Sequence, residues 1–141
     1  MDYTMMGDTV NTAARLEGVN KIYGIYTLIS DTTFNGTDNR IMTREIDYIS
    51  VVGKKEPIFV YELLGYAEGI DEKKLDTVDK YTQGLHAYRE QNWDQAITLF
   101  NQALLATPDD GPSKTMINRC NEYKINPPEK DWDGSFSMAT K

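Results

Sequence analysis

Residues 1–18, MDYTMMGDTVNTAARLEG, place the end of a strand, a turn and a helix in one short stretch. Gly7 suits the turn, and Asp8 is a good helix N-cap because its carboxylate can accept hydrogen bonds from backbone N–H groups of the first helical turn. The helix is expected to run to about Tyr23, where Gly24 supplies a C-terminal stop. The stretch therefore predicts a domain in which a helix follows directly from a strand.

Three runs after this helix have the β-branched and aromatic composition of strands. They are YTLIS (26–30), REIDYISVV (44–52) and IFVYELLG (58–65). The sequence GKKEP between the last two runs is typical of a hairpin loop. Strands combined with helices predict an α+β fold for residues 1–66, with a short mixed or antiparallel sheet.

The pattern becomes helical after a polar, charged stretch at residues 67–75, which we interpret as a linker. Residues 76–125 are expected to form an all-α module. Its helices should span roughly 75–90, 93–106 and 112–124. The C-terminal residues 126–141 are expected to be largely disordered, with Trp132 and Phe136 as docking anchors.

Five positions in and just after the first two of these helices resemble a tetratricopeptide repeat, a helix-turn-helix unit of about 34 residues. They are Gly84, Ala96, Phe100, Ala103 and Pro108. The spacing implies that Gly84 and Ala96 let the helices cross closely, while Phe100 fills the groove between them. One repeat cannot bury its apolar face alone, so it must pack on the third helix, on the first module or on a protein partner.

The composition is that of a soluble globular protein and argues against several kinds of function. The formal net charge is −7, with acidic residues spread along the chain, which argues against binding to nucleic acid or to an anionic membrane. A single histidine and a single cysteine argue against a zinc site. No apolar run approaches membrane-spanning length, and Cys120, expected to be a buried hydrophobe, fits a reducing cytoplasm.

Asn11 and Arg15 are separated by one helical turn, so they share a face that lies off the apolar stripe of the helix. A guanidinium supplies forked, permanently charged donors for a phosphate, and a neighbouring carboxamide can orient a sugar oxygen. Spacing alone leaves two other interpretations open. The residues could form an exposed polar face, or Arg15 could pair with a nearby acid.

The sequence DYTMMGDTVNTAARLEG closely resembles the C-terminal half of the class III adenylate/guanylate cyclase catalytic domain, and the similarity continues through YGIYTLISDTTF, REIDYISVVGKKEP and FVYELLG to about residue 65. The resemblance implies a ferredoxin-like fold that converts ATP to cyclic AMP and pyrophosphate in signal transduction. It also implies that Asn11 orients the ribose and that Arg15 stabilises transition-state charge at the triphosphate. Thr4 falls where the family hydrogen-bonds the base.

Two features of the binding residues leave alternatives open. Threonine replaces the more usual aspartate in many bacterial members and both favour adenine, but Thr4 could also be a strand residue without a ligand. Where the family reads V-K-G-K, this chain has VVGKK, and Val52 cannot contact phosphate. Lys54 and Lys55 are the remaining candidates for substrate binding, with a solvated hairpin tip as their other role.

The family's metal-binding aspartates precede the stretch that opens this sequence, and neither Asp2 nor Asp8 replaces them. The complete enzyme is expected to use Mg²⁺ or Mn²⁺ with no ligand from this chain, which should be inactive alone. Because the family's catalytic domains pair head to tail, the expected partners are ATP and either an N-terminal cyclase half or a second protomer, and Met1 would be internal to a longer protein. The alternative is a non-catalytic protein-interaction module built on the repeat.

Overall fold

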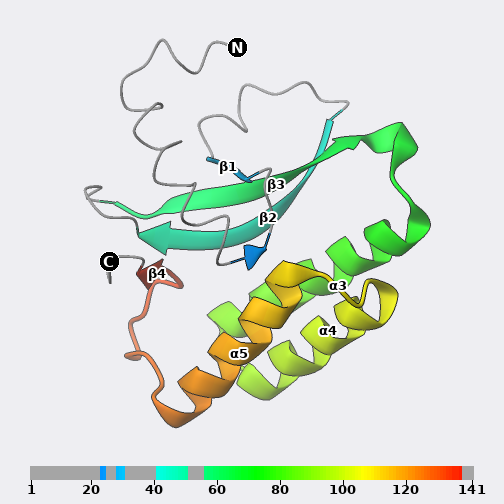
Figure 1. Cartoon of the computed structure of the whole chain (residues 1–141). Coiled ribbons are helices and arrows are strands. Elements are labelled where there is room, and N and C mark those ends of the chain that lie inside the picture. Colours follow the sequence, from blue (N-terminus) through cyan, green and yellow to red (C-terminus); the bar gives the residue numbers. More distant parts are fainter. Residues whose placement is uncertain (1–22, 25–27, 31–40, 51–55, 138–141) are drawn as a thin grey trace. The chain divides into compact units, whose positions relative to one another are not determined.

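The computed structural model shows a mixed sheet and three α-helices in the part of the chain that it describes (Figure 1). The described residues are 23–24, 28–30, 41–50 and 56–137. They divide into two compact units, a sheet unit that ends at Gly69 and resumes at Ser135, and a helical unit, Ile70–Gly134. The predicted α+β fold class is confirmed, whereas the assignment of residues 1–66 to a cyclase domain stays a prediction.

The sheet has the strand order β1-β3-β2-β4. Its strands are β1 (Leu28–Ser30), β2 (Ile41–Ser50), β3 (Ile58–Tyr66) and β4 (Phe136–Ser137). β3 runs antiparallel to both β1 and β2, whereas β4 runs parallel to the end of β2. The predicted hairpin is therefore confirmed, with β2 beginning at Ile41, before the predicted start at Arg44.

A β-bulge in β2 decides which side chains share one face of the sheet. The register between β2 and β3 shifts between Glu45 and Asp47, so that Ile46 is left as an extra residue. Side chains alternate along a regular strand, and one extra residue reverses the alternation beyond it. Arg44 and Asp47 consequently lie on the same face, although three positions separate them in the sequence.

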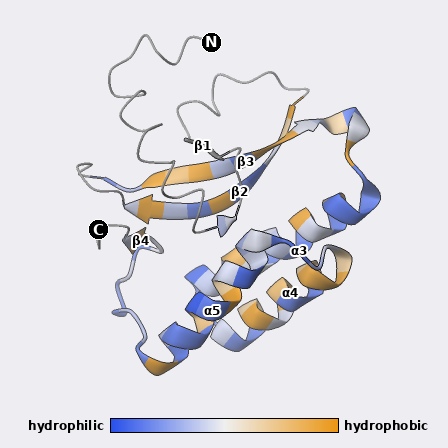
Figure 2. Cartoon of the chain, viewed as in Figure 1, coloured by the Kyte–Doolittle hydropathy of each residue, from blue (hydrophilic) through white to orange (hydrophobic). Residues whose placement is uncertain are grey.

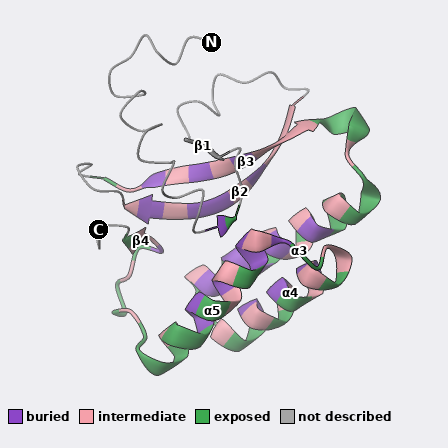
Figure 3. Ribbon diagram, in the orientation of Figure 1, coloured by how far each residue is buried: buried purple, intermediate pink, exposed green. Residues whose placement is uncertain are grey.

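This face of the β2–β3 hairpin is buried (Figure 3). Its members, each no more than 9% exposed, are Arg44, Asp47, Ile49, Ile58, Val60 and Glu62. The opposite face carries residues of intermediate exposure, among them Tyr48 and Phe59, whose rings stack with centroids 4.4 Å apart. The hairpin thus combines an apolar core with three charged side chains on its buried face.

The helical unit contains α3 (Glu72–Arg89), α4 (Trp93–Ala106) and α5 (Gly111–Ile125). α4 and α5 agree with the predicted helices. Buried residues recur every three or four positions, as Thr77, Tyr81 and Leu85 do in α3, so each helix turns one face inward. None of the helices in the described part of the chain is long and apolar enough to cross a membrane.

The predicted linker at residues 67–75 needs correction. A short 3₁₀ helix, η2 (Ala67–Gly69), follows β3, and α3 begins at Glu72, inside the predicted linker. The charged residues Glu72 and Lys73 are exposed, and Figure 2 colours this first turn hydrophilic. Glutamate and lysine favour helix strongly while their side chains stay in water, so a polar run of this kind can begin a helix.

α3 and α4 meet at Gly84 and Phe100. Phe100 is fully buried, and a Cβ atom placed on Gly84 would lie 2.6 Å from Cε1 of that ring. Ala96 and Ala103, one turn on either side of Phe100, are also fully buried, and the ring of Tyr81 packs 5.2 Å from that of Phe100. The predicted role of Phe100 as the side chain between the two helices is confirmed.

The C-terminal stretch differs from the prediction that residues 126–141 are disordered. Ile49 and Ser50 of β2 pair with Phe136 and Ser137 of β4 in the sheet unit. In the helical unit, Trp132 contacts aromatic side chains of the helices. The polar, proline-containing composition suggested disorder, but one large indole and a short strand pairing are sufficient to hold residues up to 137 in place.

Cys120 lies on α5 and is buried, as predicted. Burial raises the pKa of its thiol from the ordinary value of 9.0 to about 12, and the nearby Arg119 guanidinium opposes this shift only in part. The thiol therefore stays protonated at physiological pH and is a poor nucleophile.

Replacing Gly84 with alanine is expected to lower the free energy of unfolding of the helical unit by about 1–2 kcal/mol. Alanine favours helix by about 1 kcal/mol, but overpacking against a buried ring costs about 1–3 kcal/mol. We expect the upper half of that range, about 2–3 kcal/mol, because Tyr81 restricts how far Phe100 can move away. Urea unfolding followed by circular dichroism measures the difference. Gly69→Ala is the control, because a Cβ there meets nothing within 4 Å. Equal stability of Gly84→Ala and the wild type would show that the close contact is unimportant.

Cys120 in the folded chain is expected to react with a thiol reagent at pH 8 about a thousandfold more slowly than in concentrated urea, since its pKa lies three units above 9.0. Between pH 9 and 12 the unfolded chain releases this proton while the folded chain retains it, so the free energy of unfolding should fall with rising pH. Cys120→Ala should lack this part of the slope. A folded-state reaction rate within tenfold of the unfolded rate would contradict the burial of the thiol.

Candidate functional site

The residues predicted to contact a nucleotide lie outside the described part of the chain. They are Thr4, Asn11, Arg15, Lys54 and Lys55, together with the divergent Val52. The structure describes elements next to them in the sequence. β2 ends at Ser50 and β3 begins at Ile58, so the two lysines belong to the connection of an antiparallel hairpin.

Tyr23, at the predicted end of the helix that carries Asn11 and Arg15, is bound to the sheet through Asp47. The Tyr23 hydroxyl donates to Oδ2 of Asp47 at 2.6 Å, and both residues are fully buried. The other carboxylate oxygen, Oδ1, accepts from the backbone N–H of Tyr48 at 2.8 Å. Tyr23 has a helical backbone and Gly24 follows with a φ of 71°, the left-handed conformation of the predicted stop. A short bond from a hydroxyl to a carboxylate is strong, so it fixes Tyr23 firmly on β2.

Arg44 and Glu62 form a buried ion pair directly across the β2–β3 ladder. Nε of Arg44 donates to Oε1 of Glu62 at 3.1 Å, and Nη2 donates to the same oxygen. The Arg44 side chain is 0% exposed and that of Glu62 is 12% exposed. Two charges taken out of water are tolerated only when they are paired and hydrogen-bonded, so the pair fixes the register of the two strands.

These four residues form what we call the polar layer of the sheet unit: Tyr23, Arg44, Asp47 and Glu62. Its two carboxylates already accept from Tyr23 and from Arg44, and within the described ranges no three His, Cys, Asp or Glu side chains come together as a metal-binding group. The chemistry of the polar layer is therefore positioning. It holds the hairpin and the end of the predicted helix in one arrangement.

Sequence reasoning missed the polar layer. The run REIDYISVV has the composition of a strand, and it also places three charged residues in that strand. The apolar run IFVYELLG likewise contains Glu62. An acid inside one strand and an arginine inside its hairpin partner is the signal that could have predicted a buried pair.

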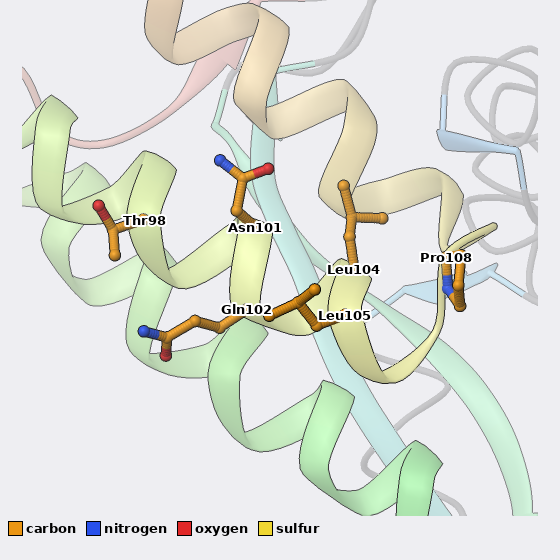
Figure 4. A pocket seen from close by; sticks show the side chains of 6 residues that line it. All are labelled: Thr98, Asn101, Gln102, Leu104, Leu105 and Pro108. Atoms are coloured by element: carbon orange, nitrogen blue, oxygen red, sulfur yellow. The ribbon is translucent and has the colours of Figure 1, made fainter.

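The helical unit has a hollow of about 460 Å³ on the surface of α4 (Figure 4). It is lined by Thr98, Asn101, Gln102, Leu104, Leu105 and Pro108. Leu105 is 84% exposed, and no lining side chain is ionisable. The hollow offers amide groups and apolar contacts, which suit a binding surface and provide no acid–base chemistry. His86 on α3 is exposed.

The chain is similar to proteins named adenylate cyclase. The terminal-differentiation specific adenylate cyclase of Dictyostelium discoideum is 30% identical over 124 residues, which cover 85% of this chain and 6% of that protein. Adenylate cyclase 1 of Rhizobium meliloti (strain 1021) is 32% identical over 77 residues, 55% of this chain and 12% of that protein. The adenylate cyclase of Anabaena cylindrica is 38% identical over 66 residues, 45% of this chain and 13% of that protein.

These matches show a cyclase-related region in the chain, which spans between 6% and 13% of the lengths of these curated relatives. No protein-family model matches the chain. No solved structure matches it. The match to the Dictyostelium discoideum protein covers 85% of the chain, so it necessarily includes residues of both the sheet unit and the helical unit.

Replacing Glu62 alone with leucine is expected to destabilise the sheet unit by about 3–5 kcal/mol, because Arg44 then loses its buried counter-charge. The double variant Arg44→Met/Glu62→Leu should recover at least half of this loss, since it removes both charges. Amide hydrogen exchange of β2 and β3 measures the effect in this unit. Asp94→Asn is the matched control: it breaks the exposed Lys124–Asp94 pair, 2.7 Å long, and should cost less than about 1 kcal/mol. A double variant as unstable as the single one would contradict the pairing argument.

Proposed function

We propose that residues 1–66 supply the ribose-binding and transition-state half of an adenylate cyclase active site, which converts ATP to cyclic AMP and pyrophosphate in signal transduction. The observation that carries the proposal is the similarity to three proteins named adenylate cyclase. The spacing of Asn11 and Arg15 on one predicted helix face, with Thr4 ahead of them, supports it from the sequence. The buried, free Cys120 is compatible with the reducing cytoplasm in which we place the protein.

In this proposal the ribose 3′-hydroxyl attacks the α-phosphorus and loses its proton, while the bond from that phosphorus to the β,γ-pyrophosphate breaks. Asn11 orients the ribose so that the hydroxyl is in line with the leaving group. Arg15 neutralises the negative charge that builds up on the phosphate oxygens. Phosphoryl transfer depends mainly on positioning and on such charge stabilisation, which these two side chains can provide. Thr4 contacts the base, and Lys54 or Lys55 reaches the triphosphate from the hairpin connection.

The polar layer supports the proposal because it attaches the end of the predicted helix to the sheet. Arg15 precedes Tyr23 by eight positions, about 12 Å along an α-helix. The hydrogen bond from Tyr23 to Asp47 therefore fixes the far end of the same predicted helix to β2. An arginine that must meet a transient charge contributes most when its backbone does not move.

Divalent metal ions, Mg²⁺ or Mn²⁺, supply activation of the hydroxyl and neutralisation of the phosphates when they are bound. In the resemblance, neither Asp2 nor Asp8 corresponds to a metal ligand. We therefore propose that another polypeptide segment holds the metal ions. This segment is the N-terminal half of a cyclase domain or a second protomer in a head-to-tail dimer.

Mixing this chain with a purified N-terminal cyclase half, ATP and Mn²⁺ is expected to produce cyclic AMP, whereas the chain alone should produce none. Arg15→Ala should lower the rate by about 100-fold or more, because it removes a preorganised donor to the transition state. Asn11→Ala should also lower the rate, and GTP in place of ATP tests the assignment of Thr4.

The control for the mixing experiment is Lys124→Ala, which removes a positive charge from an exposed ion pair and should leave the rate unchanged. Chromatographic measurement of cyclic AMP distinguishes the outcomes. A rate no higher than that of Arg15→Ala would exclude a competent half-site.

The second candidate function is a protein-interaction module of the tetratricopeptide kind. The close approach of α3 and α4 at Gly84 and Phe100 favours it, as does the hollow on α4 with its exposed Leu105. This function makes Asn11 and Arg15 dispensable. Partner binding would then survive their replacement and be lost when Phe100 is disrupted.

A further inference from the structure

Residues 129–134 dock on the helical unit through one tryptophan. The Trp132 ring meets three rings, with centroid distances of 5.2 Å to Tyr88, 6.0 Å to Trp93 and 5.6 Å to Tyr123. Tyr88 belongs to α3, Trp93 to α4 and Tyr123 to α5. The indole therefore lies where all three helices each contribute an aromatic side chain.

The three receiving rings also contact one another, and we call them the aromatic corner. Trp93 lies 5.7 Å from Tyr88 and 5.1 Å from Tyr123, while Tyr88 and Tyr123 are 6.1 Å apart. Arg119 of α5 also contacts Tyr88. Its Nη1 donates to the Tyr88 hydroxyl at 3.2 Å, and its guanidinium lies 5.9 Å from the ring centroid. The corner is thus built by contacts among the helices themselves, in addition to those with Trp132.

Two further contacts define how a segment lies on the corner. Nε2 of Gln91 donates to the backbone carbonyl of Glu129 at 3.1 Å. Gln91 itself has a φ of 63°, a left-handed conformation that is uncommon for a residue other than glycine. At the other end Gly134 has a φ of 89°, and a Cβ atom there would lie 3.3 Å from Cγ of Arg89. The helical unit therefore contacts three features of the segment: the backbone carbonyl of Glu129, the indole of Trp132 and the backbone at Gly134.

The charged side chains of the segment are exposed: Glu129, Lys130, Asp131 and Asp133. Trp132 is the side chain that contacts rings of all three helices. Pro127 and Pro128 stand between the end of α5 and the segment, and consecutive prolines favour an extended, stiff tether. One half-buried aromatic anchor in an exposed, charged stretch is typical of a short peptide on a folded surface and atypical of a core element.

We propose that the aromatic corner is a binding site for an extended segment that presents a tryptophan and, two residues later, a glycine. Residues 129–134 of this chain are its resident, displaceable occupant. The tether keeps this occupant at an effective concentration of about millimolar. A partner with the same chemistry binds the corner only by displacing it, so the resident segment acts as an internal competitor. The inference is independent of the cyclase proposal, because every contact that carries it lies in the helical unit.

The test uses the full chain with Trp132→Ala and a synthetic peptide of residues 126–134, titrated by isothermal titration calorimetry. The variant should bind the peptide at least tenfold more tightly than the wild-type chain, because the wild-type corner is already occupied. A peptide carrying alanine in place of the tryptophan should not bind. Circular dichroism checks that the variant retains its helices.

A second variant, Gly134→Ala, keeps the test decisive if Trp132→Ala fails to fold. Gly134→Ala leaves the indole in place but strains the backbone and crowds Arg89, so it should bind the peptide with an affinity between those of the wild type and Trp132→Ala. Equal affinity of a folded variant and the wild type would overturn the proposal, as would binding that survives loss of the peptide's tryptophan. The molecular mass in solution could also rise with protein concentration for the wild type and not for Trp132→Ala. This result would mean that the Trp132 segment of a second copy of the chain occupies the corner, and it would overturn the proposed internal arrangement.

Discussion

The bulge at Ile46 is the constraint on which the rest of the sheet unit depends. Without this extra residue, Arg44 and Asp47 would point to opposite faces, and one of the two buried polar contacts would be lost. With it, Asp47 meets Tyr23 while Arg44 meets Glu62 on the same face. A slip of one residue between β2 and β3 would leave a buried charge without its partner, so the polar contacts penalise every other register. The connection that contains Lys54 and Lys55 is consequently anchored at both ends by strands of fixed register.

The helical unit reaches a unique arrangement mainly through shape. Gly84 provides a notch that only a residue without a side chain can provide, and Phe100 fills it. One turn further along α3, Arg119 of α5 donates a hydrogen bond to the Tyr88 hydroxyl and also lies near the Tyr88 ring, so this nearly buried side chain joins the two helices. Each contact crosses between helices, and this makes the three helices one packed body.

Sequence patterns predicted the regular parts of this fold and failed where a single tertiary contact decides the structure. α4 and the β2–β3 hairpin follow from apolar periodicity and turn composition, which are local properties. The bulge at Ile46 cannot be recognised from the alternation of buried and exposed side chains along β2. The side chains alternate regularly before the bulge and again after it. Trp132 belongs to a stretch whose composition predicts disorder, and only the three rings that receive it reveal why it is held.

The candidate site itself was predicted from a motif and a resemblance, and its residues Thr4, Asn11, Arg15, Lys54 and Lys55 lie outside the described part of the chain. What the structure adds is the buried hydrogen bond between Tyr23 and Asp47. A resemblance transfers roles between matching positions, but it does not say what holds those positions still. Tyr23 was predicted only as the end of a helix. Its bond to Asp47 gives that end a mechanical function.

The two candidate functions are compatible with each other. The match to the Dictyostelium discoideum protein includes residues of both units, so the similarity to a protein named adenylate cyclase is not confined to the sheet unit. An active site divided between two polypeptide segments is active only during the fraction of time in which the two segments are associated. A binding surface encoded directly after one half can raise the effective concentration of the other by orders of magnitude without any new contact at the site. In the proposal for the aromatic corner, the resident Trp132 segment must leave first, so the corner would bind a partner only when that partner displaces the segment.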